Sequence, residues 1–281
     1  MPSMKIVLFA LLLALVALTR PAAADDALVE RGRYLVTSIA GCGNCHTMQG
    51  PNGPVEGMDL AGGLEMKDKF FTAYSSNITP DVETGIGRWT DAQIITAIRE
   101  GKRPDGSSIG LPMPFRMYRM ISDADVQAMV AYLRTVQPIR NPVPPSKYLI
   151  PIPPRWGPAV RNPDSPNPAD KVAYGGYLAS ALGHCVECHS GPNLFGIPDI
   201  DGRLGAGGME FPGPWGTVVA PNITPTNLGR WTDAQIVTAI TKGIRPDGSK
   251  MSPPMGYRYY ANMTKSDLDA VVAWLRQLPP K

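Results

Sequence analysis

The chain has 281 residues, of which 43% are hydrophobic and 18% charged, so it can bury a core and is not a disordered chain. Aromatic residues make up only 7%, against 29 glycines and 30 prolines, which predicts a loop-rich protein whose own large side chains do not fill its core. The net charge of +3 includes Lys5 and Arg20, which lie in a segment that we expect to be removed. Such a balance does not support a nucleic-acid partner, because phosphate binding needs clustered basic residues.

Residues 1–24 have the pattern of a secretory signal peptide. Lys5 is followed by an apolar run over 6–18, and Ala22–Ala24 supply a small-residue cleavage site. The run is shorter than the ~20 residues that a transmembrane helix needs. Arg20 keeps an uncleaved anchor as the alternative. No later segment is long and apolar enough to span a membrane, so we expect an exported protein located in the periplasm.

The sequence then repeats itself, which is its most informative feature. From Arg88 onward the two copies keep a constant offset of 142 residues. The repeat predicts two homologous domains, 25–137 and 169–281. Four motifs occur twice: Cys-x-x-Cys-His at 42–46 and 185–189, Asn-Ile-Thr-Pro at 77–80 and 222–225, Arg-Trp-Thr-Asp-Ala-Gln at 88–93 and 230–235, and Arg-Pro-Asp-Gly at 103–106 and 245–248.

Each copy predicts three short helices in a matrix of loops. The first helix runs into the cysteine motif, the second opens with a Thr-x-x-Gln capping box, and the third opens with Ser or Thr. No segment shows sustained two-residue alternation, so strands should be few and the fold class all-α. The expected apolar faces are Ile94, Ala97 and Ile98 with Ile236, Ala239 and Ile240 in the second helices, and Val126, Met129, Val130 and Leu133 with Leu268, Val271, Val272 and Leu275 in the third.

The linker 138–168 is rich in proline, so it should be extended and semi-rigid. Because it also carries Tyr148, Ile150 and Trp156, we expect a strap that lies against the domains and fixes their separation.

The two Cys-x-x-Cys-His motifs carry the chemistry. Sulfurs three residues apart share one face of a helical turn and can form thioethers to one edge of a porphyrin, and the histidine one turn on can bind its iron. We therefore expect a covalent haem at each motif, which would also fill the core that lacks aromatic residues. The attachment residues are Cys42, Cys45, Cys185 and Cys188, and the proximal iron ligands are His46 and His189.

Three other uses of the cysteines are weaker. Two disulfides are the usual reading of four cysteines in an exported protein, but they leave the histidines unexplained. A thioredoxin-like redox pair would need a strand–helix context that is not visible. A shared zinc site would need ligands from segments about 140 residues apart.

A methionine opposite the histidine would suit electron transfer, because a thioether ligand raises the iron potential. Met113 and Met255 occupy equivalent positions and each follows a proline. Met66 and Met209 are a rival pair, but the neighbouring glycine pairs align Met209 with Leu64 instead. The alternative for any methionine is that it fills a gap in the core.

Weaker candidates lie near the motifs. His184 is too close to its attachment turn to reach the far face of that haem, so it is a surface or propionate-contacting residue. Arg88 and Arg230 either pair with propionates or are solvated. Pro51 or Pro192, just past each histidine, could offer a carbonyl to the imidazole N–H.

With these residues in hand, the chain resembles a di-haem cytochrome c built from two tandem class I cytochrome c domains. The resemblance rests on the Tyr-Leu pair before each cysteine motif, the Asn-Ile-Thr-Pro and Trp-Thr-Asp motifs, and the Pro-Met loop before the third helix. It implies about three helices and loops wrapped round a haem in each domain, with Met113 and Met255 as sixth iron ligands. Within this family it resembles the cytochrome c subunits of periplasmic alcohol and aldehyde dehydrogenases, which typically carry three haems and a membrane-binding tail. This sequence has two motifs, which leaves the donor open.

The resemblance implies a periplasmic carrier of single electrons with two covalently bound haem c groups, more an electron-transfer subunit than an enzyme. A periplasmic dehydrogenase would be the donor, and an oxidase or another cytochrome the acceptor. Membrane association would be peripheral, through a complex. The alternative is a di-haem enzyme of the peroxidase or thiosulfate-oxidising type, although all four cysteines are used by attachment. A haem-based gas sensor would need an output module, and none is visible.

Overall fold

A computed structural model of the protein describes residues 22–281 except 51–52, 158–159, 161–162, 195–196 and 214. The expected leader, residues 1–24, lies outside the described residues except for its last three, with which helix α2 begins. Helices dominate, and every strand is two to four residues long. The described part of the chain is therefore mainly helical, and it also contains small sheets that the expectation of an all-α fold did not include.

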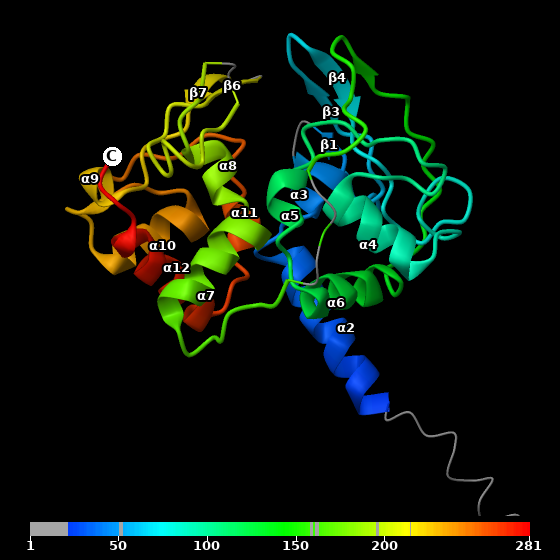
Figure 1. The fold of residues 1–281 in the computed structure, drawn as a ribbon, viewed down its shortest axis with the longest axis horizontal. Helices are drawn as coiled ribbons and strands as arrows, with labels where there is room; N and C mark the ends of the chain where they lie inside the picture. The colour runs from blue at the N-terminus through cyan, green and yellow to red at the C-terminus, as the bar shows by residue number, and fades with distance from the viewer. Residues whose placement is uncertain (1–21, 51–52, 158–159, 161–162, 195–196, 214) are drawn as a thin grey trace, which may run out of the picture.

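The N-terminal elements form one side of the molecule in Figure 1, and the C-terminal elements form the other. In chain order the first set is α2 (Ala22–Thr37), α3 (Gly43–His46), β1 (Gln49–Gly50), β2 (Gly53–Pro54), β3 (Glu65–Lys67), β4 (Phe71–Tyr74), α4 (Asp91–Glu100), α5 (Phe115–Tyr118) and α6 (Asp123–Leu133). Strand β5 (Lys147–Tyr148) follows and pairs with β4 of this first set. The second set is α7 (Lys171–Tyr177), the π-helix η1 (Leu178–Leu182), α8 (Cys185–His189), β6 (Glu210–Gly213), β7 (Gly216–Val219), α9 (Pro225–Leu228), α10 (Asp233–Lys242), α11 (Tyr257–Tyr260) and α12 (Lys265–Gln277).

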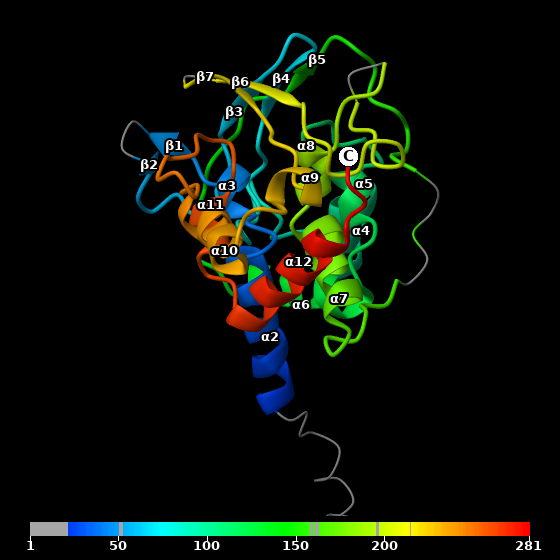
Figure 2. The same ribbon diagram turned by 90° about the vertical axis from the view of Figure 1, so that its left-hand side faces the viewer.

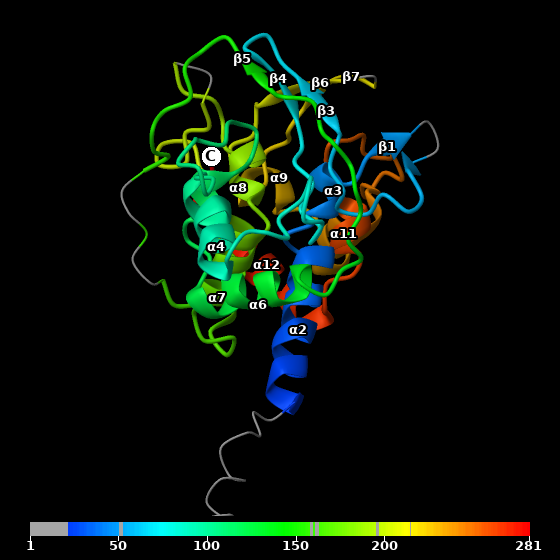
Figure 3. The same ribbon diagram turned by 90° about the vertical axis from the view of Figure 1, so that its right-hand side faces the viewer.

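All three small sheets are antiparallel, with strand orders β1-β2, β3-β4-β5 and β6-β7. The β3-β4-β5 and β6-β7 sheets lie at one end of the molecule, and helices α6, α7 and α12 lie at the opposite end (Figures 2 and 3).

The predicted second and third helices begin where the capping signals place them. Thr90 and Thr232 each accept a hydrogen bond at 3.2 Å from the backbone N–H of the glutamine three residues on, and that glutamine accepts one at 2.8 Å in return. Ser122 and Thr264 cap α6 and α12. The expected apolar faces are buried, with Ile240 half-buried. Local capping and hydrophobic period agree, which explains why these boundaries could be predicted.

In each half, the helix before the cysteine motif packs against the last helix of that half, α2 on α6 and α7 on α12. A glycine makes each approach close. A Cβ added to Gly32 would lie 1.8 Å from the Ala128 carbonyl oxygen, and one added to Gly175 would lie 1.9 Å from the Ala270 carbonyl oxygen. Backbone atoms block both positions, so no side-chain rotation could relieve the clash.

We expect Gly32→Ala to destabilise the protein by about 3 kcal/mol, because α2 and α6 would have to move apart. The measurement is denaturant unfolding of the haem-loaded protein. Gly175→Ala should behave alike. Gly50→Ala is the control, since its nearest contact would be an ordinary 3.5 Å. Equal stability of Gly32→Ala and the unmodified protein would show that the helices do not approach this closely.

Two equivalent tyrosines join the two halves reciprocally. The Tyr34 hydroxyl of α2 donates to Asp267 at 2.6 Å and accepts from the Thr264 N–H at 3.2 Å. The Tyr177 hydroxyl of α7 donates to Asp125 at 2.8 Å and accepts from the Ser122 N–H at 3.0 Å. Each tyrosine thus reaches the N-terminus of the last helix in the other half. One continuous cluster of buried hydrophobic side chains includes residues of both halves.

Tyr177→Phe should lower the free energy of unfolding by about 2 kcal/mol, because the buried Asp125 carboxylate and Ser122 N–H lose a partner. Tyr34→Phe should have a somewhat smaller effect, because Tyr34 is only half-buried. The matched control is Tyr74→Phe, which removes a 2.8 Å bond to Glu65 at an exposed position. Chemical denaturation gives the comparison, and equal losses for Tyr177→Phe and Tyr74→Phe would contradict the reciprocal contact.

The proline-rich segment contacts the N-terminal half, as expected of a strap, whereas its expected role in fixing the separation of the domains stays a prediction. Asn141 Nδ2 donates to the Ala61 carbonyl at 2.9 Å, and the Ser146 hydroxyl accepts from the Tyr74 N–H at 2.9 Å. Its pairing as β5 with β4, in which Phe71 faces Tyr148, was not anticipated.

Candidate functional site

None of the four cysteines forms a disulfide, and each cysteine motif forms one turn of helix. Cys42 precedes α3, and the His46 N–H donates to the Cys42 carbonyl at 2.9 Å. In the second motif, α8 runs from Cys185 to His189. The predicted geometry is present in both places, with two thiols three residues apart on a helical turn and the imidazole close behind.

The two imidazole rings are held in the same way. His46 Nδ1 lies 2.7 Å from the Ser76 carbonyl oxygen, and His189 Nδ1 lies 2.8 Å from the Pro221 carbonyl oxygen. A carbonyl only accepts, so Nδ1 carries the hydrogen and Nε2 keeps a free lone pair. The expectation that Pro192 would supply the carbonyl for His189 is wrong, because that carbonyl belongs to Pro221, 32 residues after the histidine. Pro51, the equivalent expectation in the first motif, lies outside the described residues.

The repeated Asn-Ile-Thr-Pro motif positions these carbonyls, since Ser76 and Pro221 directly precede it. In the first copy, Asn77 Oδ1 accepts from the Thr79 N–H at 2.9 Å, and its Nδ2 donates to the Ile139 carbonyl at 2.7 Å.

The second copy repeats the arrangement. Asn222 Oδ1 accepts from the Thr224 N–H at 2.7 Å, and Asn222 Nδ2 donates to the Lys281 carbonyl at 2.9 Å. The motif was visible in the sequence, but its role in orienting the histidines was missed.

The protonation state of the two histidines also suits iron binding. Burial lowers the pKa of both His46 and His189, and the bond to the carbonyl offsets only part of that effect. Both imidazoles are therefore neutral at neutral pH, as a metal ligand must be. Burial also raises the pKa of the Cys42 thiol to about 12. Two thiols and an oriented neutral imidazole on one turn fit the attachment of a haem c.

The predicted sixth ligands occupy equivalent places in two matching loops. Met113 and Met255 are half-buried, each two residues before a short helix, α5 or α11. Met113 also packs against the buried core cluster. Their binding to iron stays a prediction.

The rival methionine pair is not equivalent. The Ser75 N–H donates to the Leu64 carbonyl, whereas the Ala220 N–H donates to the Met209 carbonyl at the same point of the matching hairpin. Met66 instead pairs with Ala73 within β3 and β4. The predicted alignment of Met209 with Leu64 is confirmed.

His184 lies between the two halves rather than on a free surface. Its backbone is left-handed, with φ at 39°, and its ring meets the Tyr118 ring edge-on with centroids 5.7 Å apart. Its Nδ1 lies 3.3 Å from a Glu187 carboxylate oxygen.

Arg88 and Arg230 are exposed, and nothing in the structure tests their pairing with propionates. Two other arginines, which the sequence did not single out, donate hydrogen bonds to the backbone of Trp89 and Trp231, the residues that follow Arg88 and Arg230. Arg134 donates to the Trp89 carbonyl, and Arg276 donates to the Trp231 carbonyl at 2.5 Å.

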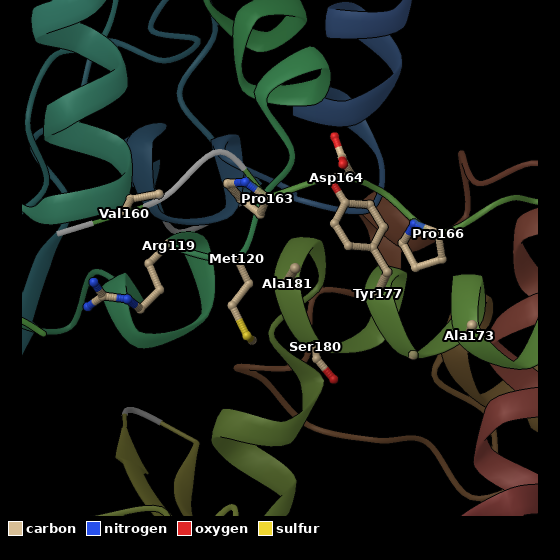
Figure 4. Close-up of a pocket in the computed structure, with 11 residues that line it drawn as sticks. Arg119, Met120, Val160, Pro163, Asp164, Pro166, Ala173, Tyr177, Ser180 and Ala181 are labelled. Atoms are coloured by element: carbon tan, nitrogen blue, oxygen red, sulfur yellow. The ribbon is translucent and has the colours of Figure 1, made fainter. Parts of the chain in front are cut away.

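A cavity of about 590 Å³ lies apart from these motifs, between the end of α5, the strap and helix α7 with η1 (Figure 4). Tyr177, Met120 and Pro163 are among its lining residues, which include none of the eight candidate site residues. Within the described ranges, no three or more His, Cys, Asp or Glu side chains gather as a metal cluster, and no helix is long and apolar enough to cross a membrane.

Comparison with known proteins matches residues 27–133 to the family described as cytochrome C oxidase, cbb3-type, subunit III. The chain is 35% identical over 291 residues to the alcohol dehydrogenase (quinone), cytochrome c subunit, of Gluconacetobacter polyoxogenes, covering 96% of this chain and 60% of that protein. It is 32% identical to the fructose dehydrogenase cytochrome subunit of Gluconobacter japonicus, covering 93% of this chain and 54% of that protein. It is 30% identical to a diheme cytochrome c-type protein of Cereibacter sphaeroides, covering 93% of this chain and 92% of that protein.

Proposed function

Because this chain belongs to the c-type cytochromes, and to the family of the diheme cytochrome c-type protein in particular, we propose that it carries two haems and transfers single electrons. In the first site, Cys42 and Cys45 attach the haem, and His46 and Met113 bind its iron. In the second, the same roles fall to Cys185 and Cys188 with His189 and Met255. The bound haem supplies an iron that cycles between Fe(III) and Fe(II), and the protein contributes ligation, burial and orientation.

We assign the two sites to two domains, residues 25–137 and 169–281, joined by the strap 138–168. The matched capping boxes, the matched helix pairs and the equivalent His–carbonyl bonds support this division. Each assigned domain contains one helix-borne cysteine motif and one proline–methionine loop.

The observation that carries the proposal is the closeness of the two cysteine motifs. Asn44, between the first two cysteines, donates to the Pro254 carbonyl at 3.4 Å, next to Met255. On the other side, His184, which directly precedes Cys185, meets the Tyr118 ring of the N-terminal half edge-on, with ring centroids 5.7 Å apart. Attachment motifs that both pack against the opposite half suit a pair of haems that exchange electrons.

The named relatives support a role for this electron exchange in a dehydrogenase complex. The chain spans about 60% of the length of the quinone alcohol dehydrogenase cytochrome subunits and 92% of the diheme cytochrome. Two relatives are named as the cytochrome subunits of fructose and gluconate dehydrogenases. We propose a dehydrogenase as donor and an oxidase or another cytochrome as acceptor, in the periplasm after removal of residues 1–24, with peripheral membrane association through the complex.

A coulometric titration of the purified haem-loaded protein tests the proposal. We expect two electrons per chain, taken up reversibly, and complete reoxidation by an oxidised single-haem cytochrome c. Turnover of hydrogen peroxide or thiosulfate without a partner protein would contradict it. None of the relatives named above is a peroxidase or a thiosulfate-oxidising enzyme, so that alternative is not carried further.

A further inference from the structure

The two methionine loops, 109–114 and 251–256, differ in what covers them. The strap adds β5 to the β3-β4 hairpin, whereas the matching hairpin of β6 and β7 pairs with no further strand among the described residues. This difference brings strap residues onto the first loop alone.

Two strap side chains donate hydrogen bonds to carbonyls of the first loop, both on the N-terminal side of Met113. The Tyr148 hydroxyl donates to the Leu111 carbonyl at 2.8 Å, two residues before Met113. Trp156 Nε1 donates to the Ile109 carbonyl, also at 2.8 Å.

Ring packing reinforces both bonds. Trp156 stacks on Phe115 with ring centroids 5.6 Å apart, and Phe115 is 1% exposed. The Tyr148 ring covers Gly110 so closely that an added Cβ would lie 2.3 Å from it. The loop therefore has packed partners on both sides of Met113.

The second loop has much less support. Ser252 is exposed whereas its counterpart Gly110 is buried, and Tyr257, at the position of the buried Phe115, is only half-buried. Helix α11 has no buried residue, whereas α5 buries Phe115, Met117 and Tyr118. Among the described residues, the other half contributes to this loop a 3.4 Å hydrogen bond from Asn44 to the Pro254 carbonyl.

We propose that Tyr148 and Trp156 are positioning residues that hold Met113 on the first iron, so that Met255 is the methionine that leaves its iron more readily. The inference rests on the methionine ligation proposed above. For a methionine to leave the iron, its loop must move away from the haem. Each hydrogen bond and packed ring that this movement breaks raises its free-energy cost, so the state with the methionine displaced is less populated. The second iron is thereby the one more open to an external ligand.

A titration of the ferric haem-loaded protein with imidazole tests this proposal. Displacement of each methionine is measured as the loss of the red absorption band that marks methionine bound to ferric haem. Met255→Ala reports Met113 alone, and Met113→Ala reports Met255 alone. We expect half-displacement of Met113 to need about tenfold more imidazole than that of Met255. Adding Trp156→Ala to Met255→Ala should remove most of this difference, and Tyr148→Phe should remove part of it.

Two controls separate positioning from general destabilisation. Leu149→Ala, 80% exposed and next to Tyr148 in the strap, should leave the Met113 titration unchanged. Trp156→Ala added to Met113→Ala should leave the Met255 titration unchanged. Equal imidazole requirements for the two methionines, or a Trp156→Ala shift at both sites, would overturn the inference while leaving methionine ligation intact. If the unmodified ferric protein lacked the red band, the ligation itself would be refuted.

Discussion

Replacing Cys42 and Cys45 together with alanine is expected to reduce the haem content of the purified protein from two per chain to one. The two thiols are the only covalent attachment points in the first motif, and the second pair sits on a separate helix, α8. A thioether-linked haem survives denaturation, so mass spectrometry of the unfolded chain counts attached haems directly. Replacement of Cys185 and Cys188 should remove the other haem.

Asn44→Ala is the matched control, because Asn44 lies within the same motif but has no role in attachment. It should retain two haems. If the double cysteine variant kept two covalent haems, or lost both while still folded, independent attachment at the two motifs would be contradicted.

Met113→Ala and Met255→Ala are each expected to remove one methionine–iron signature and to convert one iron from low-spin to high-spin. A neutral thioether favours Fe(II) over Fe(III), so the potential of the altered haem should fall. Optical and electron paramagnetic resonance spectra with a potentiometric titration give the three readouts. The unaltered haem should keep its own signature in each variant.

Met120→Ala is the control for this pair, since Met120 follows α5 closely but is 43% exposed and has Asn262 as its counterpart. It should change neither spectrum nor potential. Retention of both methionine signatures in Met113→Ala would show that another residue binds the first iron.

Much of the fold could be predicted because its signals are local. A threonine followed three residues later by glutamine caps α4 and α10 at Thr90 and Thr232. Burial follows the helical period of the apolar residues in α6 and α12. The cysteine motif is equally local, since one helical turn brings its thiols and imidazole together.

The contacts that could not be predicted join residues far apart in the chain. Any residue type can supply the carbonyl that holds a histidine ring, so Ser76 and Pro221 left no signal except their place before Asn-Ile-Thr-Pro. The bond from Tyr34 to Asp267 spans 233 residues and depends on how the halves pack. The pairing of Tyr148 with Phe71 likewise needed the path of the strap.

The central claim is that one electron-transfer protein carries two haems. Its most direct test is to record the haem-to-protein ratio and the oxidised and reduced optical spectra of one preparation of the unmodified chain, matured in a periplasm. We expect two covalent haems per chain, both low-spin in both oxidation states and neither binding carbon monoxide readily. One haem per chain, or a high-spin iron that binds carbon monoxide at once, would contradict the account.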